Sequence, residues 1–228
     1  METAGLTASD GDAVAILATL KQLTTQSTTP VSKGKAAKIQ TNRQRRVFHT
    51  LHALHLAFAA AAGQAAADDS VDGQHARSLL QQCEKGTVDT FTRLLAAAEF
   101  HYVLTSATAA VLADVLVVLC TALYSKVVAG GLASALKLAQ GRNVPRNVRL
   151  CTAICVGRAL GACGHQLRAI HDASVAFLTK GVRASEACVR EACLVGLERA
   201  VVGCGRFLAA QHRSIFQVSA CGRACVAA

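Results

Sequence analysis

Three histidines at intervals of three residues, in the stretch HTLHALHL, are the first candidates for chemistry, because imidazole nitrogens are common metal ligands. On an α-helix a step of three residues turns each side chain by about 60° from the last, so His49 and His55 diverge by about 120° around His52. A single Zn²⁺ needs convergent ligands, and no nearby cysteine or carboxylate completes a tetrahedron. We therefore expect solvated or interface histidines, and the sequence predicts no metal site and no cofactor.

The ten cysteines are the next candidates. Their closely spaced pairs lack the CxxC spacing of zinc ribbons. These pairs are Cys151/Cys155, Cys188/Cys193 and Cys221/Cys225. The opening residues METAGLTASDGDA are acidic and lack an apolar core, so we expect neither a secretory signal nor disulfides. Most of the thiols stand among Ala, Val and Leu, which favours packing as small buried hydrophobic side chains.

Two further patterns bear on catalysis. Gly157, Gly161 and Gly164 in GRALGACG do not form a phosphate loop, because no strand precedes them and no Lys-Ser/Thr follows. Close approach of two helices, or the end of a helix, is the better explanation of these glycines. No Ser/His/Asp or Cys/His arrangement has a local signature in the chain. The sequence therefore predicts that this protein is not an enzyme.

The positive charge is concentrated in the second half of the chain. Residues 1–125 hold ten Lys/Arg and ten Asp/Glu, whereas residues 126–228 hold fourteen Lys/Arg and four Asp/Glu, which supplies the whole net charge of +10. A basic half can meet nucleic acid, acidic lipid or an acidic protein, or its arginines can simply solvate apolar helices. The candidate partner-binding residues are Arg142, Arg146, Arg149, Arg168, Arg190 and Arg213. Arg149 and Arg190 have a structural alternative, in which they bond carbonyls of a neighbouring repeat.

A second basic run lies nearer the N-terminus. Between Lys33 and Arg46 six basic residues occur with no acid. A solvated linker is the expected interpretation, with an anionic membrane contact and a nuclear or nucleic-acid patch as alternatives. Aromatic residues do not interleave with the run, which speaks against stacking on bases.

The elements that must position these residues are predicted to be helices. Hydrophobic residues make up 52% of the chain, aromatic residues 4%, and there are two prolines, so Ala, Leu, Val and Cys supply the apolar faces of an all-α protein. The segment 148–164 recurs, ungapped, at 189–205, with matching Val-Arg pairs at its start and Cys-Gly at its end. Helix pairs that repeat about every 40 residues predict a HEAT/armadillo-type α-solenoid of stacked antiparallel helix pairs.

The predicted organisation has four parts. Residues 1–26 form an N-terminal helix, 27–42 a basic linker, 43–101 an irregular helical part, and 102–228 HEAT-like repeats of which the last is incomplete. Helix ends are expected at Gly63 and at the Lys85-Gly86 pair.

The apolar segment 102–124 has the length of a transmembrane helix. However, Asp114 stands at its centre, and a carboxylate inside a bilayer is costly. A helix buried among neighbours fits at least as well, and a small integral membrane protein is the alternative.

Three segments resemble the N-terminal region of the HEAT-repeat-containing protein 5 family, large accessory proteins of the clathrin adaptor at the trans-Golgi network and endosomes. They are LCTALYSKVV (119–128), VRLCTAICVGRALGACGHQL (148–167) and HRSIFQVSACGRA (212–224). The resemblance implies a cytoplasmic, non-catalytic scaffold, peripheral on those membranes, with clathrin-adaptor subunits or their accessory proteins as partners. A basic solenoid that binds nucleic acid, or a structural subunit of another large assembly, is the alternative function.

Overall fold

The computed structural model describes residues 10–25, 33–67, 71–211 and 215. Every regular element in this described part is helical, which confirms the all-α prediction. The α-helices are α1 (Asp10–Leu23), α2 (Lys33–Ala67), α3 (Val71–Ala96), α4 (Ser106–Leu123), α5 (Lys126–Ala139), α6 (Arg146–Cys163), α7 (His171–Gly181) and α8 (Ala187–Cys204). Short 3₁₀ helices lie at η1 (Ala98–Val103), η2 (Arg168–Ile170) and η3 (Gly205–Gln211).

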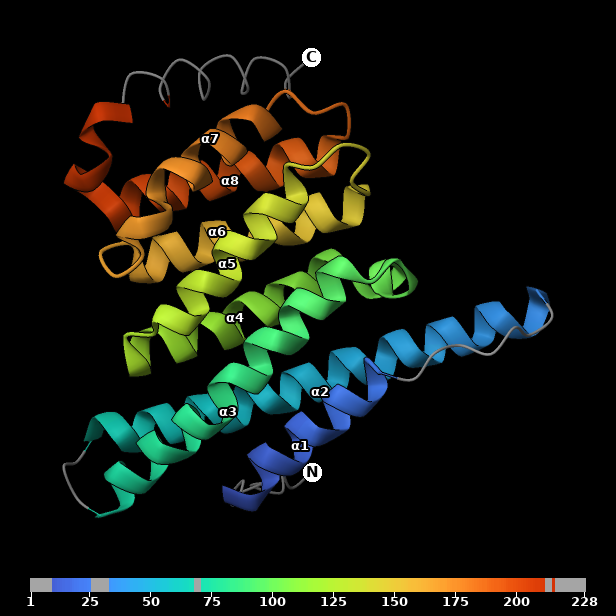
Figure 1. Cartoon of the computed structure of the whole chain (residues 1–228), viewed down its shortest axis with the longest axis vertical. Helices are drawn as coiled ribbons and strands as arrows, with labels where there is room; N and C mark the ends of the chain where they lie inside the picture. Colours follow the sequence, from blue (N-terminus) through green and yellow to red (C-terminus); the bar gives the residue numbers. More distant parts are fainter. Residues whose placement is uncertain (1–9, 26–32, 68–70, 212–214, 216–228) are drawn as a thin grey trace, which may run out of the picture.

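The helices pack in two layers that follow the order of the chain. α2, α4, α6 and α8 contact one another in succession, and α1, α3, α5 and α7 do the same beside them. Contacts between the layers join helices adjacent in sequence, such as α1 with α2 and α7 with α8. In Figure 1 the chain accordingly climbs from α1 at the bottom to α7 and α8 at the top. The core is one continuous set of buried Leu, Val, Ala, Cys and Phe side chains between the layers.

Local sequence signals set several helix boundaries. Thr105 precedes α4, and its hydroxyl accepts a hydrogen bond from the Thr108 N–H, as an N-cap does. Tyr124 ends that helix in the left-handed region, with φ of 52°. Ser125 caps α5 in the same way as Thr105 caps α4. Pro145 stands immediately before α6, where a missing N–H costs nothing.

Three predicted boundaries are wrong. The predicted linker 27–42 is helical from Lys33 onward, because this basic run is the start of α2 rather than a connection. α2 also continues through Gly63 to Ala67, beyond the helix end that was predicted at Gly63. α3 passes unbroken through Gly86, so no helix ends at the Lys85-Gly86 pair.

α4 was the candidate membrane span. Of the described helices, it has the length and mean hydropathy (2.1 over Ser106–Leu123) that a crossing would need. In the structure it lies between α2 and α6, and Leu112, Leu116 and Leu119 are among its fully buried residues. Asp114 forms an ion pair with Arg158 of α6. This is the packing expected of a core helix, with its one carboxylate paired.

α6 and α8 approach each other more closely than the side chains of larger residues would allow. A Cβ on Gly157 would lie 2.5 Å from the Cα of Gly196, and one on Gly203 would lie closer than 3.0 Å to the carbonyl oxygens of Leu160 and Gly161. We call this contact the glycine seam. It confirms the prediction that the glycines of GRALGACG serve close helix packing.

The described cysteines pack as small hydrophobic side chains. All but Cys188 are buried, which confirms the predicted packing. Several thiols also face backbone carbonyls of the preceding helix in their layer, for example Cys155 toward Ala109 at 3.7 Å and Cys204 toward Leu160 at 3.8 Å. The small thiol therefore fits the close spacing of α4, α6 and α8.

Candidate functional site

A cleft of about 900 Å³ lies between the C-terminal ends of α5 and α7. Three basic side chains line it: Arg149 of α6, Lys180 of α7, and Arg183 from the turn that follows. We call it the basic cleft. Its other lining residues are Ala139, Gln140, Gly141, Asp172, Val175, Ala176, Phe177, Thr179, Gly181, Ala184 and Val189.

Helix lengths and helix ends create this cleft. α7 has 11 residues, against 18 in α6 and in α8, so it covers less of the layer beneath it. α5 ends at Ala139 and α7 at Gly181, so two helix C-termini, each with partial negative charge, meet there. Lys137 and Lys180 stand in the last turns of these two helices, as that charge favours.

The floor of the cleft is apolar and carries unused hydrogen-bonding groups. Val175, Phe177 and Val189 form buried parts of its lining. The Thr179 hydroxyl and the Arg149 Nε are buried without a hydrogen-bond partner among the described residues. Both side chains belong to the lining of the basic cleft.

Arg149 and Arg190 both make structural contacts, but neither bonds a carbonyl of a neighbouring repeat as the structural alternative predicted. Arg149 forms an ion pair of 2.6 Å with Glu186, which precedes α8. The pKa of Glu186 lies below its usual value. The Glu186 carboxylate accepts a hydrogen bond from the Glu186 backbone N–H, and it lies near the positive charge of Arg149. Arg190 donates to the carbonyls of Ala184 and Ser185, in the turn before its own helix rather than in a neighbouring repeat. The two arginines thus fasten the α7–α8 connection at the edge of the basic cleft.

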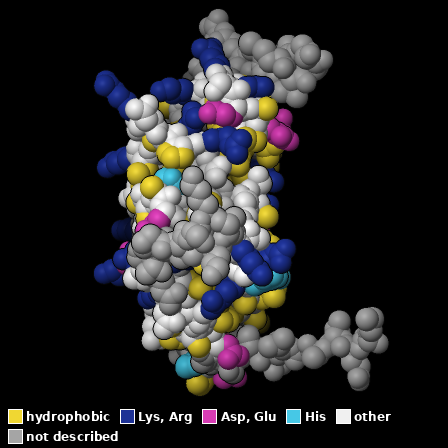
Figure 2. All heavy atoms as spheres, turned by 90° about the vertical axis from the view of Figure 1, so that its right-hand side faces the viewer, with side chains coloured by type: hydrophobic (Ala, Val, Ile, Leu, Met, Phe, Trp, Pro, Cys, Tyr) yellow, Lys and Arg dark blue, Asp and Glu magenta, His cyan; other side chains and the backbone are white. Residues whose placement is uncertain are grey.

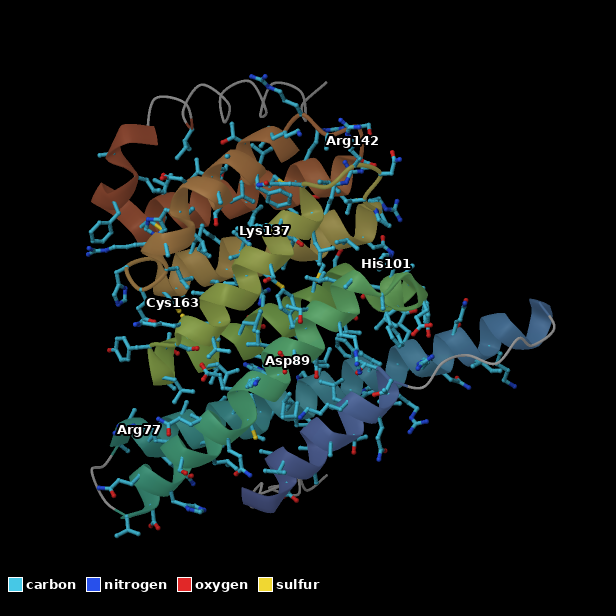
Figure 3. The ribbon with its side chains drawn as sticks, in the orientation of Figure 1. Arg77, Asp89, His101, Lys137, Arg142 and Cys163 are labelled. Carbon is cyan, nitrogen blue, oxygen red and sulfur yellow. The ribbon has the colours of Figure 1, made fainter. Side chains whose placement is uncertain are left out.

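The remaining predicted arginines are dispersed. Arg142 and Arg146 are exposed in the α5–α6 loop and the first turn of α6, and Figure 3 shows Arg142 near the N-terminal end of α6. Arg168 lies at the other end of α6, with its guanidinium 4.0 Å from the centre of the Phe207 ring. Arg213 lies outside the described residues. The structure therefore groups Arg142, Arg146 and Arg149, and separates Arg168 from them.

Sequence reasoning missed Lys180 and Arg183. Both flank Gly181, which ends α7, and both are exposed. Basic residues around a helix-ending glycine are a usual helix C-terminal signal, so nothing local distinguishes a binding pair from a capping pair. Lys180 and Arg183 lie at a cleft only because the fold places the end of α7 beside the end of α5.

The histidine cluster of α2 is arranged around an aromatic ring. His49 and His52 contact the Phe48 ring, with centroid distances of 5.7 and 6.4 Å. Within the part of the chain that the structure describes, no three His, Cys, Asp or Glu side chains are placed to hold a metal ion.

A buried Cys–His pair lies where α6 and α8 end. Cys204 Sγ is 3.4 Å from His171 Nε2, but the same nitrogen is 2.7 Å from the carbonyl oxygen of Gly164. Since a carbonyl only accepts, Nε2 carries the hydrogen and donates it, so it is not free to take a proton from the thiol. Burial also raises the pKa of Cys204 to about 11. The pair is therefore a packing arrangement rather than an activated nucleophile.

Alkaline pH is expected to destabilise the protein through its buried thiols. Burial raises the pKa of Cys193 to about 12 and that of Cys204 to about 11, whereas an unfolded thiol titrates near about 8.5. Between about pH 9 and pH 11 the folded state holds more protons, so each thiol lowers the free energy of unfolding by about 1.4 kcal/mol per pH unit. Urea titrations across this range measure the slope. A Cys193→Ala/Cys204→Ala variant should have a shallower slope than wild type, and equal slopes would contradict the assignment.

No family model, curated protein or solved structure matches the chain. The geometry and charge of the basic cleft are therefore the strongest indications of function.

Proposed function

We propose that this protein is a non-catalytic scaffold, a HEAT/armadillo-type α-solenoid whose basic cleft binds an acidic segment of a partner protein. The carrying observation is the cleft itself, with Arg149, Lys180 and Arg183 around an apolar floor. The two layers of helices in sequential contact, and the 41-residue recurrence of α6 in α8, support the solenoid assignment.

The chemistry of the cleft favours an acidic peptide. Among the described residues Lys180 and Arg183 have no ion-pair partner, and Asp172 is the one acidic side chain in the lining. Carboxylates of a bound segment would therefore meet uncompensated cations, and its aliphatic side chains would meet Val175. A volume of about 900 Å³ suits a few residues of extended chain.

A protein partner is favoured over nucleic acid because the cleft offers no aromatic platform. Phe177, its single aromatic lining residue, is only 6% exposed, so it presents no face on which a base could stack. Base stacking is the usual means by which single-stranded nucleic acid is held in a basic groove.

The family resemblance supplies a biological setting for this proposal. It places the scaffold among accessory factors of clathrin-adaptor trafficking, in the cytoplasm and on trans-Golgi or endosomal membranes. Clathrin-adaptor subunits or their accessory proteins are then the partners to test. Such a partner needs only an accessible acidic segment to fit the basic cleft.

Charge reversal in the cleft is the direct test. We expect a Lys180→Glu/Arg183→Glu variant to bind a fluorescent peptide rich in Asp, Glu and Leu at least about tenfold more weakly than wild type, because two attractions become repulsions. Anisotropy titrations measure the affinity, and affinity capture with mass spectrometry tests for clathrin-adaptor subunits. The control, Lys85→Glu/Lys126→Glu, makes the same charge change at exposed sites on α3 and α5 away from the cleft lining. Equal weakening in both variants would reduce the effect to net charge and refute the cleft.

A further inference from the structure

The solvent-facing side of α2 carries a line of basic side chains. Lys38, Arg45, His49 and His52 follow one another at intervals of seven, four and three residues, which places them on one face of the helix, and all are exposed. The opposite face holds buried Val47 and packs into the core. We call these four residues the α2 stripe. Packing fixes the rotation of α2, so the stripe faces outward.

No acid on α2 neutralises the stripe. The 35 residues of the helix include no Asp and no Glu. α2 is also longer than α1, α3 and α4, which have 14, 26 and 18 residues, and in Figure 1 its N-terminal end extends beyond them. Figure 2 shows Lys and Arg side chains grouped beside a histidine on this side of the molecule. The basic end of α2 is therefore accessible to a large surface.

A shallow pocket of about 240 Å³ opens beside the stripe, between α2 and the start of α4. Its lining combines a guanidinium, an imidazole, hydroxyl groups and an amide, with no carboxylate. The lining residues are Thr41, Gln44, Arg45, Phe48, His49, Thr105, Ala107 and Thr108. Guanidinium and hydroxyl groups are suited to the oxygens of a phosphate.

We propose that the α2 stripe docks the protein on an anionic phospholipid bilayer. Each basic side chain near an anionic leaflet adds to a shared electrostatic attraction, and a line of them on one helix acts on the surface together. The aliphatic side chains Ile39 and Leu56, 44% and 56% exposed, lie on the same helix and can contact the interfacial region of a bilayer. This surface uses none of the residues of the basic cleft.

A bilayer is favoured over nucleic acid by what surrounds the charges. Phe48 is the one Phe, Tyr or Trp in the segment 38–52 that the α2 stripe spans, and it is partly buried with His49 and His52 against its ring. It is therefore not available to stack on a base. Exposed aliphatic side chains also gain nothing from a phosphate backbone, whereas they gain from an interface with lipid.

Vesicle sedimentation with the full chain tests the proposal. We expect binding to vesicles of about seven parts phosphatidylcholine to three parts phosphatidylserine, and none to phosphatidylcholine alone, at about 0.15 M salt. A Lys38→Ala/Arg45→Ala variant should bind the anionic vesicles about 30-fold more weakly, since two of the interacting charges are lost. The control, Lys180→Ala/Arg183→Ala, removes two charges from the basic cleft and should bind like wild type.

Three outcomes would overturn the α2 stripe as a membrane surface. They are equal binding to neutral and anionic vesicles, equal weakening by the control variant, and stripe-dependent binding to duplex DNA or RNA without binding to vesicles. Thermal unfolding of both variants checks that they fold, which is expected because the substituted side chains are exposed. The acidic-peptide titration separates the two proposals. Lys180→Ala/Arg183→Ala should lose binding to the peptide, whereas Lys38→Ala/Arg45→Ala should keep it.

Discussion

Replacing Gly203 with alanine should lower the free energy of unfolding by about 3 kcal/mol, because the added methyl group has no space in the glycine seam. The new Cβ would lie closer than 3.0 Å to the carbonyl oxygens of Leu160 and Gly161. These atoms belong to the backbone of α6, so no side-chain rotation can relieve the overlap and the two helices must separate. Urea unfolding followed by circular dichroism measures the loss.

Gly130→Ala is the matched control for this prediction. Gly130 lies within α5, and a Cβ there would have no atom within 4 Å. Alanine in a helix interior is favoured over glycine by up to about 1 kcal/mol, so this variant should be as stable as wild type or more stable. If Gly203→Ala were as stable as Gly130→Ala, the close contact of α6 with α8 would be refuted.

Replacing Arg43 with alanine should cost about 2–3 kcal/mol, because its buried guanidinium joins three elements. Its Nε and Nη2 donate to the carbonyl oxygen of Leu23, the last residue of α1, at 3.1 and 2.6 Å. The guanidinium also lies 4.8 Å from the centre of the Phe100 ring in η1. Loss of the guanidinium removes the hydrogen bonds to the Leu23 carbonyl and the packing between α2, α1 and η1. Thermal and urea unfolding both measure the resulting loss of stability.

Two companion variants sharpen the Arg43 prediction. Arg46→Ala removes an exposed charge one turn later and should change stability by less than about 0.5 kcal/mol. Arg43→Lys keeps the charge but cannot make the two-nitrogen contact, so it should recover only part of the loss. Similar stabilities for Arg43→Ala and Arg46→Ala would show that the guanidinium contact with α1 contributes little.

Helix positions were predictable where the determining interactions are local. Pro145 and Ser125 mark helix starts through backbone geometry and capping, which involve only the next few residues. Gly63 and Gly86 misled because a glycine weakens a helix only slightly, and packing along α2 and α3 outweighs that cost.

The candidate site was predictable only in part for the same reason. Charge asymmetry pointed to Arg142, Arg146 and Arg149, but the ion pair of Arg149 with Glu186 spans 37 residues and has no local signal. The basic run at the start of α2 shows the limit most clearly. Arg43 is 9% exposed and structural, whereas Arg45 is exposed, and two positions on a helix decide the difference.

The sequential contacts between the helices have a consequence for how the chain folds. Within the described part, each helix packs mainly on the next helix or the one after it, so few contacts need distant parts of the chain to meet. A low average separation between contacting residues is associated with rapid folding. α1, α2 and α3 contact one another. They can therefore dock during synthesis, before the ribosome has released α8, and each later pair adds to a surface that is already ordered.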